Sequence, residues 1–198
     1  MEPTRGAHPS LARVLTGTLD GVGGTRIRVE ADVAPMLPGF TLVGLAGAAL
    51  RESRERIGRA IQNAGFSWPE GRITVSLAPA DVRKDGAVMD LAIALAILLA
   101  SGQVARPHSD RLRRTLFVGE LALDGALRPG RGVVAMALDA RRLGVDTVVV
   151  AESQLDELCD VGDTKVVGLD HLVRLPALLQ KLGRSSPAPA PGRRSSSA

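Results

Sequence analysis

RITVSLAPADVRKDGAVMDLAIALAILLASG, residues 72–102, contains the clearest structural patterns in the chain. Apolar and polar residues alternate over Arg72–Ala78, which predicts a β-strand, and Pro79 ends it because proline has no N–H to give to a sheet. Leu91–Ala100 contains no polar side chain, and a helix that is apolar all round is either buried or inside a membrane. Its ten residues are too few to cross a bilayer, which takes about 20. We therefore predict a buried central helix, with the polar loop at its N-terminus as the place for a site.

Composition limits the classes of protein that the chain can be. Of its 198 residues, 45% are hydrophobic and 23% are charged, which is ordinary for a globular protein. Aromatic residues make up only 2%, which argues against a single-strand nucleic-acid reader that stacks bases on aromatic rings. The net charge of +4 comes mostly from the last fifteen residues, which hold three arginines and no acid. The rest of the chain is close to neutral, so its charge points to nucleic acid only weakly.

Cysteine usage and the start of the chain bear on location. Cys159 is the lone cysteine, so the sequence predicts neither a disulfide framework nor a cysteine-based zinc site. Met1–Ser10 lacks the pattern of a signal peptide. We expect a reducing, cytoplasmic location with no membrane contact.

The chain divides into three regions by composition. We predict a disordered N-terminus over residues 1–10, a single domain over 11–182 and a disordered Pro/Ser/Ala-rich tail over 183–198. Asp124-Gly125 predicts a two-residue hairpin turn. The remaining strands are predicted at Leu11–Thr18, Thr25–Val33, Phe40–Val43, Leu116–Val118, Asp146–Val150 and Lys165–Val167, and the remaining helices at Ala46–Ala64, Val133–Leu143, Glu152–Cys159 and Asp170–Leu182.

The helix predicted over Ala46–Ala64 has a charged face. Glu52 precedes Arg56 by four residues, and Glu55 precedes Arg59 in the same way, which is the favoured order for ion pairs on a helix. The sequence favours a solvated face with these ion pairs. The alternative is a basic face that contacts phosphate.

The chemistry available to the chain is limited. Its three histidines have no metal-ligand spacing, so we expect no metal site. The Walker A pattern GxxxxGK[ST] is absent from the sequence, so we expect no ATP hydrolysis by this chain and no cofactor in it. Lys84-Asp85-Gly86 leads into the central helix, where an anion is stabilised by the helix N-terminus. Asp85 is placed to cap that helix.

Three segments of the chain read PGFTLVGLAGAALRESRERIGRAIQNAGF, RITVSLAPADVRKDGAVMDLAIALAILLASG and GELALDGALRPGRG. Together they resemble the N-terminal domain of the YifB/ComM family of magnesium-chelatase-like AAA+ proteins, and the resemblance is collinear from about Leu11 to Leu182. The resemblance implies an α/β fold (two-layer α+β) of the Lon-protease-domain type, also called ribosomal-protein-domain-2-like, with helices packed on a mixed sheet. It also implies a ring, a hexamer in the family, built with a AAA+ ATPase module. ATP and Mg²⁺ would belong to that module, and ComM-type members imply a role in DNA branch migration.

Lon proteases carry a catalytic Ser–Lys pair that this chain lacks. Carried over by position, the serine place is Val88 and the lysine place is about Val134. Valine can act neither as a nucleophile nor as a base. The resemblance therefore implies a domain that does not catalyse proteolysis by itself, either as a stand-alone chain or as part of a longer protein.

Three functions remain open from the sequence. The first is a non-catalytic accessory and oligomerisation domain of a DNA-acting AAA+ ATPase. The second is a Lon-like peptidase with a displaced pair, such as Lys84 with Ser76 or Ser53, although Lys84 is more simply interpreted as a solvated loop lysine or a phosphate contact. The third is direct DNA binding. Candidate residues for a functional surface are Arg83, Lys84, Asp85, Arg128, Arg131, Arg51, Arg54 and Arg59.

Overall fold

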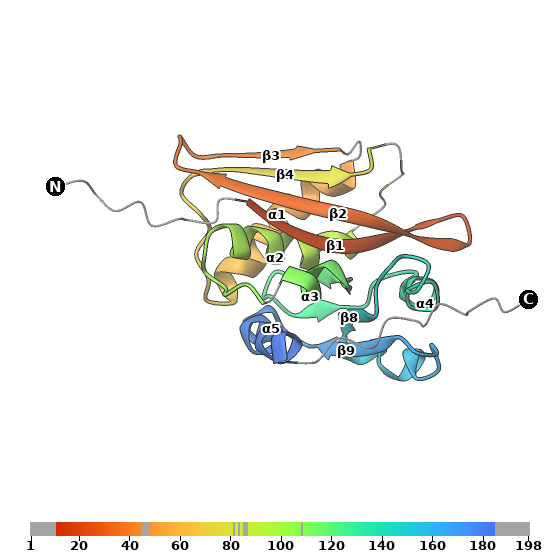
Figure 1. Cartoon of the computed structure of the whole chain (residues 1–198). Coiled ribbons are helices and arrows are strands. Elements are labelled where there is room, and N and C mark those ends of the chain that lie inside the picture. The colour runs from red at the N-terminus through yellow and green to blue at the C-terminus, as the bar shows by residue number, and fades with distance from the viewer. Residues whose placement is uncertain are drawn as a thin grey trace, which may run out of the picture.

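The computed structural model in Figure 1 describes residues 11–44, 48–80, 82, 84, 87–107 and 109–184, without the side chains of 48–51 and 109. The strands are β1 (Leu11–Asp20), β2 (Gly23–Ala34), β3 (Gly39–Val43), β4 (Arg72–Ala78), β5 (Thr115–Phe117), β6 (Glu120–Leu121), β7 (Leu127–Arg128), β8 (Thr147–Ala151) and β9 (Lys165–Leu169). The α-helices are α1 (Ala48–Asn63), α2 (Asp90–Ala100), α3 (Ser109–Arg113), α4 (Val133–Leu138) and α5 (Leu175–Arg184).

The main sheet has seven strands in the order β3-β4-β2-β1-β5-β8-β9, and β6 and β7 form a separate hairpin. β2 is antiparallel to both of its neighbours, whereas the other pairs in the sheet are parallel. This confirms the predicted mixed sheet with helices packed on it. The two halves of the sheet meet at one point, because β1 pairs with β5 only through Leu15 and Leu116.

The predicted central helix is confirmed as α2, and every one of its residues is buried. It packs on the face of β1 and β2 that carries their alternating aliphatic side chains, such as Val14 and Val29. Figure 1 shows α1 on the same side of these strands. Aliphatic residues without polar groups gain most from such complete burial, about 1.5–3 kcal/mol for each large side chain.

On the other face of β1 and β2, α4 packs near Gly17 and Gly24. Gly17 and Gly24 leave room there for Met136, since a Cβ on Gly17 would lie 2.7 Å from the Met136 sulfur and one on Gly24 would lie 3.0 Å from the Met136 Cα. Asp139, just past the helix, accepts a hydrogen bond from the Gly24 N–H at 2.8 Å. Arg142 donates to the Gly24 carbonyl at 2.6 Å. The side chains of Asp139 and Arg142, just past α4, therefore hold the backbone of the hairpin of β1 and β2.

Several local predictions need correction. The hairpin of β6 and β7 has a loop of three residues rather than two, because Ala122 donates to Ala126 and Gly125 takes the left-handed backbone (φ 94°) that the longer loop requires. The predicted helix at Glu152–Cys159 consists of two short 3₁₀ turns.

Two helix ends also differ from the predictions. α4 ends at Leu138 instead of Leu143, because the chain tightens into turns once the Asp139 side chain bonds the hairpin. α5 continues through Gly183 and Arg184, two residues into the segment predicted as a disordered tail.

Candidate functional site

A cleft of about 480 Å³ opens where β1 and β5 part. β1 continues past its single pairing point to Asp20, while the chain after β5 turns away into β6. The loop before α4 closes the third side. The lining residues are Thr18, Leu19, Ala87, Val88, Glu120, Pro129, Gly130, Arg131 and Met136.

The place that corresponds to the Lon serine lies in this cleft. Val88 is only 9% exposed and lines the cleft wall. Its carbonyl accepts the Gly119 N–H at 2.8 Å, and a Cβ on Gly130 would lie 2.8 Å from Val88 Cγ2. The valine side chain therefore fills the space against the Gly130 backbone. No hydroxyl is available at this position.

The predicted lysine place is about Val134, in the first turn of α4, and Val134 is not among the described residues that line the cleft. Its side chain is 39% exposed. Ionisable groups do line the cleft, namely Glu120 and Arg131. They can bind a polar ligand, but neither of them is the serine nucleophile or the amine base that Lon chemistry needs.

The cleft wall at Gly130 is fixed by a residue that the sequence analysis missed. The Gln154 amide accepts the Gly130 N–H at 2.9 Å and donates to the Gly130 carbonyl at 3.1 Å. Gln154 is only 5% exposed. A glutamine that satisfies both backbone groups of one residue holds the loop as a neighbouring strand would. No sequence pattern marks such a contact.

A buried polar cluster lies at the start of α2. Asp90 is fully buried and pairs with Arg56 of α1 at 3.0 Å. The Leu121 N–H also donates to Asp90, at a long 3.4 Å. Burial raises the pKa of Asp90 to about 6, against the opposing effects of Arg56, Ser53 and the Leu121 N–H. The pairing of Arg56 with Asp90 corrects the prediction that Arg56 is a solvated partner of Glu52.

The Lys84 loop is described only in part. The Lys84 side chain is 5% exposed and donates to the Val82 carbonyl at 3.0 Å. This corrects the interpretation of Lys84 as a solvated lysine and removes it from the exposed surface. Arg83 and Asp85 lie outside the described residues. The residue before α2 is Met89, which makes no side-chain cap.

The two serines considered as partners of Lys84 lie on opposite sides of the sheet. Ser53 is on α1, and its hydroxyl accepts a hydrogen bond from Arg56 at 3.0 Å. Ser76 alternates in β4 with Val75 and Leu77, which face the helices, so it points to the other side. At most one of these serines can therefore approach Lys84.

The predicted surface arginines do not form one patch. Arg54 and Arg59 line a groove on α1 with Trp68 and Leu123, and Arg54 lies 5.4 Å from the centre of the Phe40 ring. Arg131 lines the cleft, and Arg128 is exposed on β7. The side chain of Arg51 lies outside the described part of the chain.

Within the described residues, histidine, cysteine and acidic side chains do not gather in groups of three or more that could hold a metal ion. None of the helices in the described part of the chain combines the length and the apolar character needed to cross a bilayer.

A mixed sheet with two helices on one face is the architecture that the resemblance predicts for a Lon-like domain, and Val88, at the predicted serine place, lines its cleft. The family model described as subunit ChlI of Mg-chelatase matches residues 29–154. The chain belongs to this magnesium-chelatase-like family, in the group of YifB and ComM.

Relatives place the chain in a longer context. It is 39% identical over 171 residues to the uncharacterized protein YifB of Escherichia coli, covering 86% of this chain and 33% of YifB. It is 40% identical over 154 residues to the competence protein ComM of Haemophilus influenzae, covering 78% of this chain and 30% of ComM. A Lon protease of Chloroflexus aurantiacus is 30% identical over 147 residues, covering 71% of this chain and 17% of the protease. The chain thus spans about a third of the length of its YifB and ComM relatives.

Proposed function

We propose that this chain is a non-catalytic accessory domain that assembles, as a ring, with a magnesium-chelatase-like AAA+ ATPase acting on DNA. The observation that carries the proposal is the cleft lined by Val88, at the predicted serine place, together with Val134 at about the predicted lysine place. Peptide-bond cleavage by this type of site needs an activated hydroxyl and a base. A domain that has kept its architecture without either group is suited to assembly and binding.

The relatives support the proposed context. The name of the Haemophilus influenzae relative refers to competence, which favours a DNA-processing role, including branch migration, for the assembly. We assign ATP and Mg²⁺ to the ATPase module, because the Walker A pattern is absent from this chain. We propose a cytoplasmic location, a single domain over residues 11–182 and a hexameric ring.

Native mass spectrometry tests the assembly directly. The full chain is measured alone and after mixing with a separately produced YifB-type ATPase module, and the ATPase rate is followed in parallel. We expect oligomers of the chain or a mixed complex, together with a change in the ATPase rate. A chain that stays monomeric in both samples and leaves the ATPase rate unchanged would refute the proposal.

A further inference from the structure

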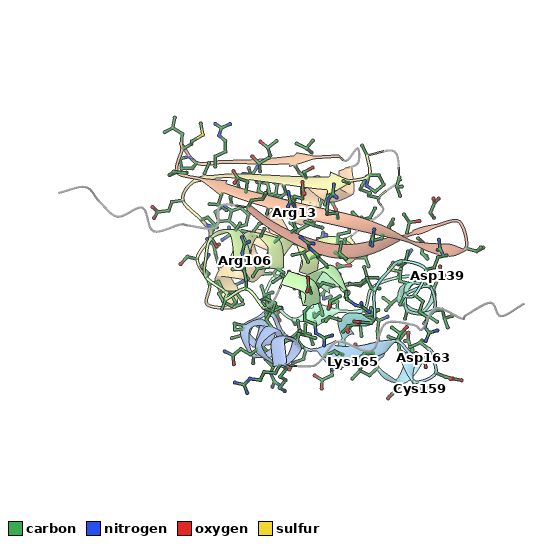
Figure 2. All side chains as sticks on the ribbon, in the orientation of Figure 1. Arg13, Arg106, Asp139, Cys159, Asp163 and Lys165 are labelled. Atoms are coloured by element: carbon green, nitrogen blue, oxygen red, sulfur yellow. The ribbon has the colours of Figure 1, made fainter. Side chains whose placement is uncertain are left out.

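A second hollow, of about 430 Å³, lies on the face of β1 and β2 that points away from α2. Its lining includes four arginines and a single acidic residue. Arg13 comes from β1, Arg26 and Arg28 from β2, and Arg113 from the end of α3. Figure 2 shows Arg13 at the ribbon of these two strands, with Arg106 below it. None of the four arginines was among the residues predicted for a functional surface.

The strand register explains why these side chains gather. Arg26, Arg28 and Glu30 alternate with buried residues in β2, so all three point to the same face. Arg13 pairs in register with Glu30. The loop before β5 then places α3, and with it Arg113, beside β1.

The positive charge of the hollow is not balanced within the described part of the chain. The carboxylate of Glu30 is shared, at 2.7 Å from Arg13 and 3.4 Å from Arg28. Arg26 donates to the Leu143 carbonyl at 2.9 Å, which leaves its charge uncompensated. Arg113 has no carboxylate partner among the described residues. Guanidinium groups held close together repel one another, so an anion bound between them would relieve that repulsion.

We propose that this four-arginine hollow binds the sugar-phosphate backbone of duplex DNA. Guanidinium groups form paired hydrogen bonds to phosphate oxygens, and duplex DNA presents about one negative charge per 1.7 Å of its axis. The remaining lining, from Val14, Leu15 and Leu112, is aliphatic and offers no ring on which a base of single-stranded DNA can stack.

The proposed contact is independent of base sequence. The hollow is set into a sheet face, and base-edge readout in the major groove requires a projecting helix or β-ribbon. The proposal rests on the proposed function for the presence of DNA. It adds the surface of the chain that contacts the DNA. It replaces the α1 arginines as the expected DNA contact.

The test measures binding of a short fluorescent duplex to the full chain by anisotropy, over salt concentrations of about 50 to 200 mM. Three proteins are compared: the unchanged chain, the double variant Arg28→Gln/Arg113→Gln and the control Arg54→Gln/Arg59→Gln. The control removes the same charge from exposed arginines on α1. We expect the slope of log affinity against log salt to be about −3 for the unchanged chain.

For the double variant in the hollow, we expect the slope of log affinity against log salt to be smaller in magnitude by about two. We also expect this variant to bind the duplex about 10- to 100-fold more weakly at about 0.1 M salt. The control is expected to keep both values. Circular dichroism melts check that each variant folds. If the double variant does not fold, Arg113→Gln alone carries the test, with the slope reduced by about one.

Three results would overturn the proposal. They are no duplex binding by the unchanged chain at low salt, equal loss in both double variants, or binding of single-stranded DNA or polyglutamate as tight as that of the duplex. Native mass spectrometry with the ATPase module remains a separate readout. A chain that joins the ATPase but ignores the duplex refutes this surface alone, whereas a chain that binds duplex through the hollow but never joins an ATPase refutes the accessory role alone.

Discussion

Asp90 links three elements through one buried carboxylate. It starts α2, pairs with Arg56 of α1 and accepts the Leu121 N–H of β6. Its Oδ1 has no hydrogen-bond partner among the described residues. A carboxylate left partly unsatisfied in the interior holds its proton more strongly than in water, which agrees with the raised pKa of about 6.

The raised pKa of Asp90 predicts a stability that falls as pH rises. Between pH 3.8 and about 6 the unfolded chain has lost the Asp90 proton and the folded chain keeps it, so each step up in pH favours unfolding. At about 1.4 kcal/mol per pKa unit, this corresponds to about 3 kcal/mol. Asp90→Asn lacks this titration. Urea unfolding of both proteins at pH 4 and at pH 7 measures this effect. The free energy of unfolding of the unchanged chain, minus that of Asp90→Asn, should fall by about 2–3 kcal/mol from pH 4 to pH 7.

Other carboxylates cancel in that comparison. The pKa of Asp139, for instance, is lowered by its hydrogen bond from Arg142, and Asp139 titrates alike in both proteins. A difference between the two proteins that is the same at both pH values would contradict the assignment to Asp90.

Val88 and Val134 are expected to respond differently to the residues that a Lon protease would carry. Val88→Ser places a hydroxyl in a nearly closed site against the Gly130 backbone, so we expect a loss of about 1–3 kcal/mol. Val134→Lys puts a long side chain at a position that is 39% exposed, and we expect a change within about 0.5 kcal/mol. Urea unfolding measures both. Equal costs would mean that Val88 is not packed as described.

At the scale of elements, α4 is positioned by glycines in β1 and β2. Gly24→Ala would bring a Cβ to 3.0 Å from the Met136 Cα, and a helix backbone cannot yield as a side chain can. We expect a loss of about 1–3 kcal/mol. Gly39→Ala is the matched control in β3, because its nearest neighbour is the Arg72 side chain at 3.8 Å. Thermal unfolding of both variants checks this, and an equal loss in the control would refute it.

At the scale of the whole molecule, one core joins the two halves of the sheet. The narrow link between β1 and β5 is supported by α2 and by a single cluster of buried side chains that includes Val14, Leu95 and Val148. We therefore expect one cooperative unfolding transition. Trp68, the sole tryptophan, reports on α1 by fluorescence, and circular dichroism reports on all elements. Separate midpoints for the two signals would show two independently stable units.

Local patterns in the sequence were enough to predict the helices and strands whose residues are all buried or strictly alternate between buried and exposed. β4 over Arg72–Ala78 and the core helix were predicted because a two-residue period and an unbroken apolar run each have one structural solution. The assignment of Val88 and about Val134 to the places of the protease pair is what the family resemblance implies, and it stays a prediction. The end of α4 and the loop at Gly125 were predicted wrongly, because a distant side-chain contact and the backbone geometry of the loop decided them.

Residue types and their order along the chain were enough to predict the aliphatic core and the family, since both depend only on which residue stands at each position. Tertiary structure alone decided which charges meet. Arg56 pairs with Asp90, 34 residues away, instead of with its helical neighbour. Arg113 joins Arg13 and Arg28 through strand register and the placement of α3. Such contacts depend on distances between elements, which no local pattern of the sequence encodes.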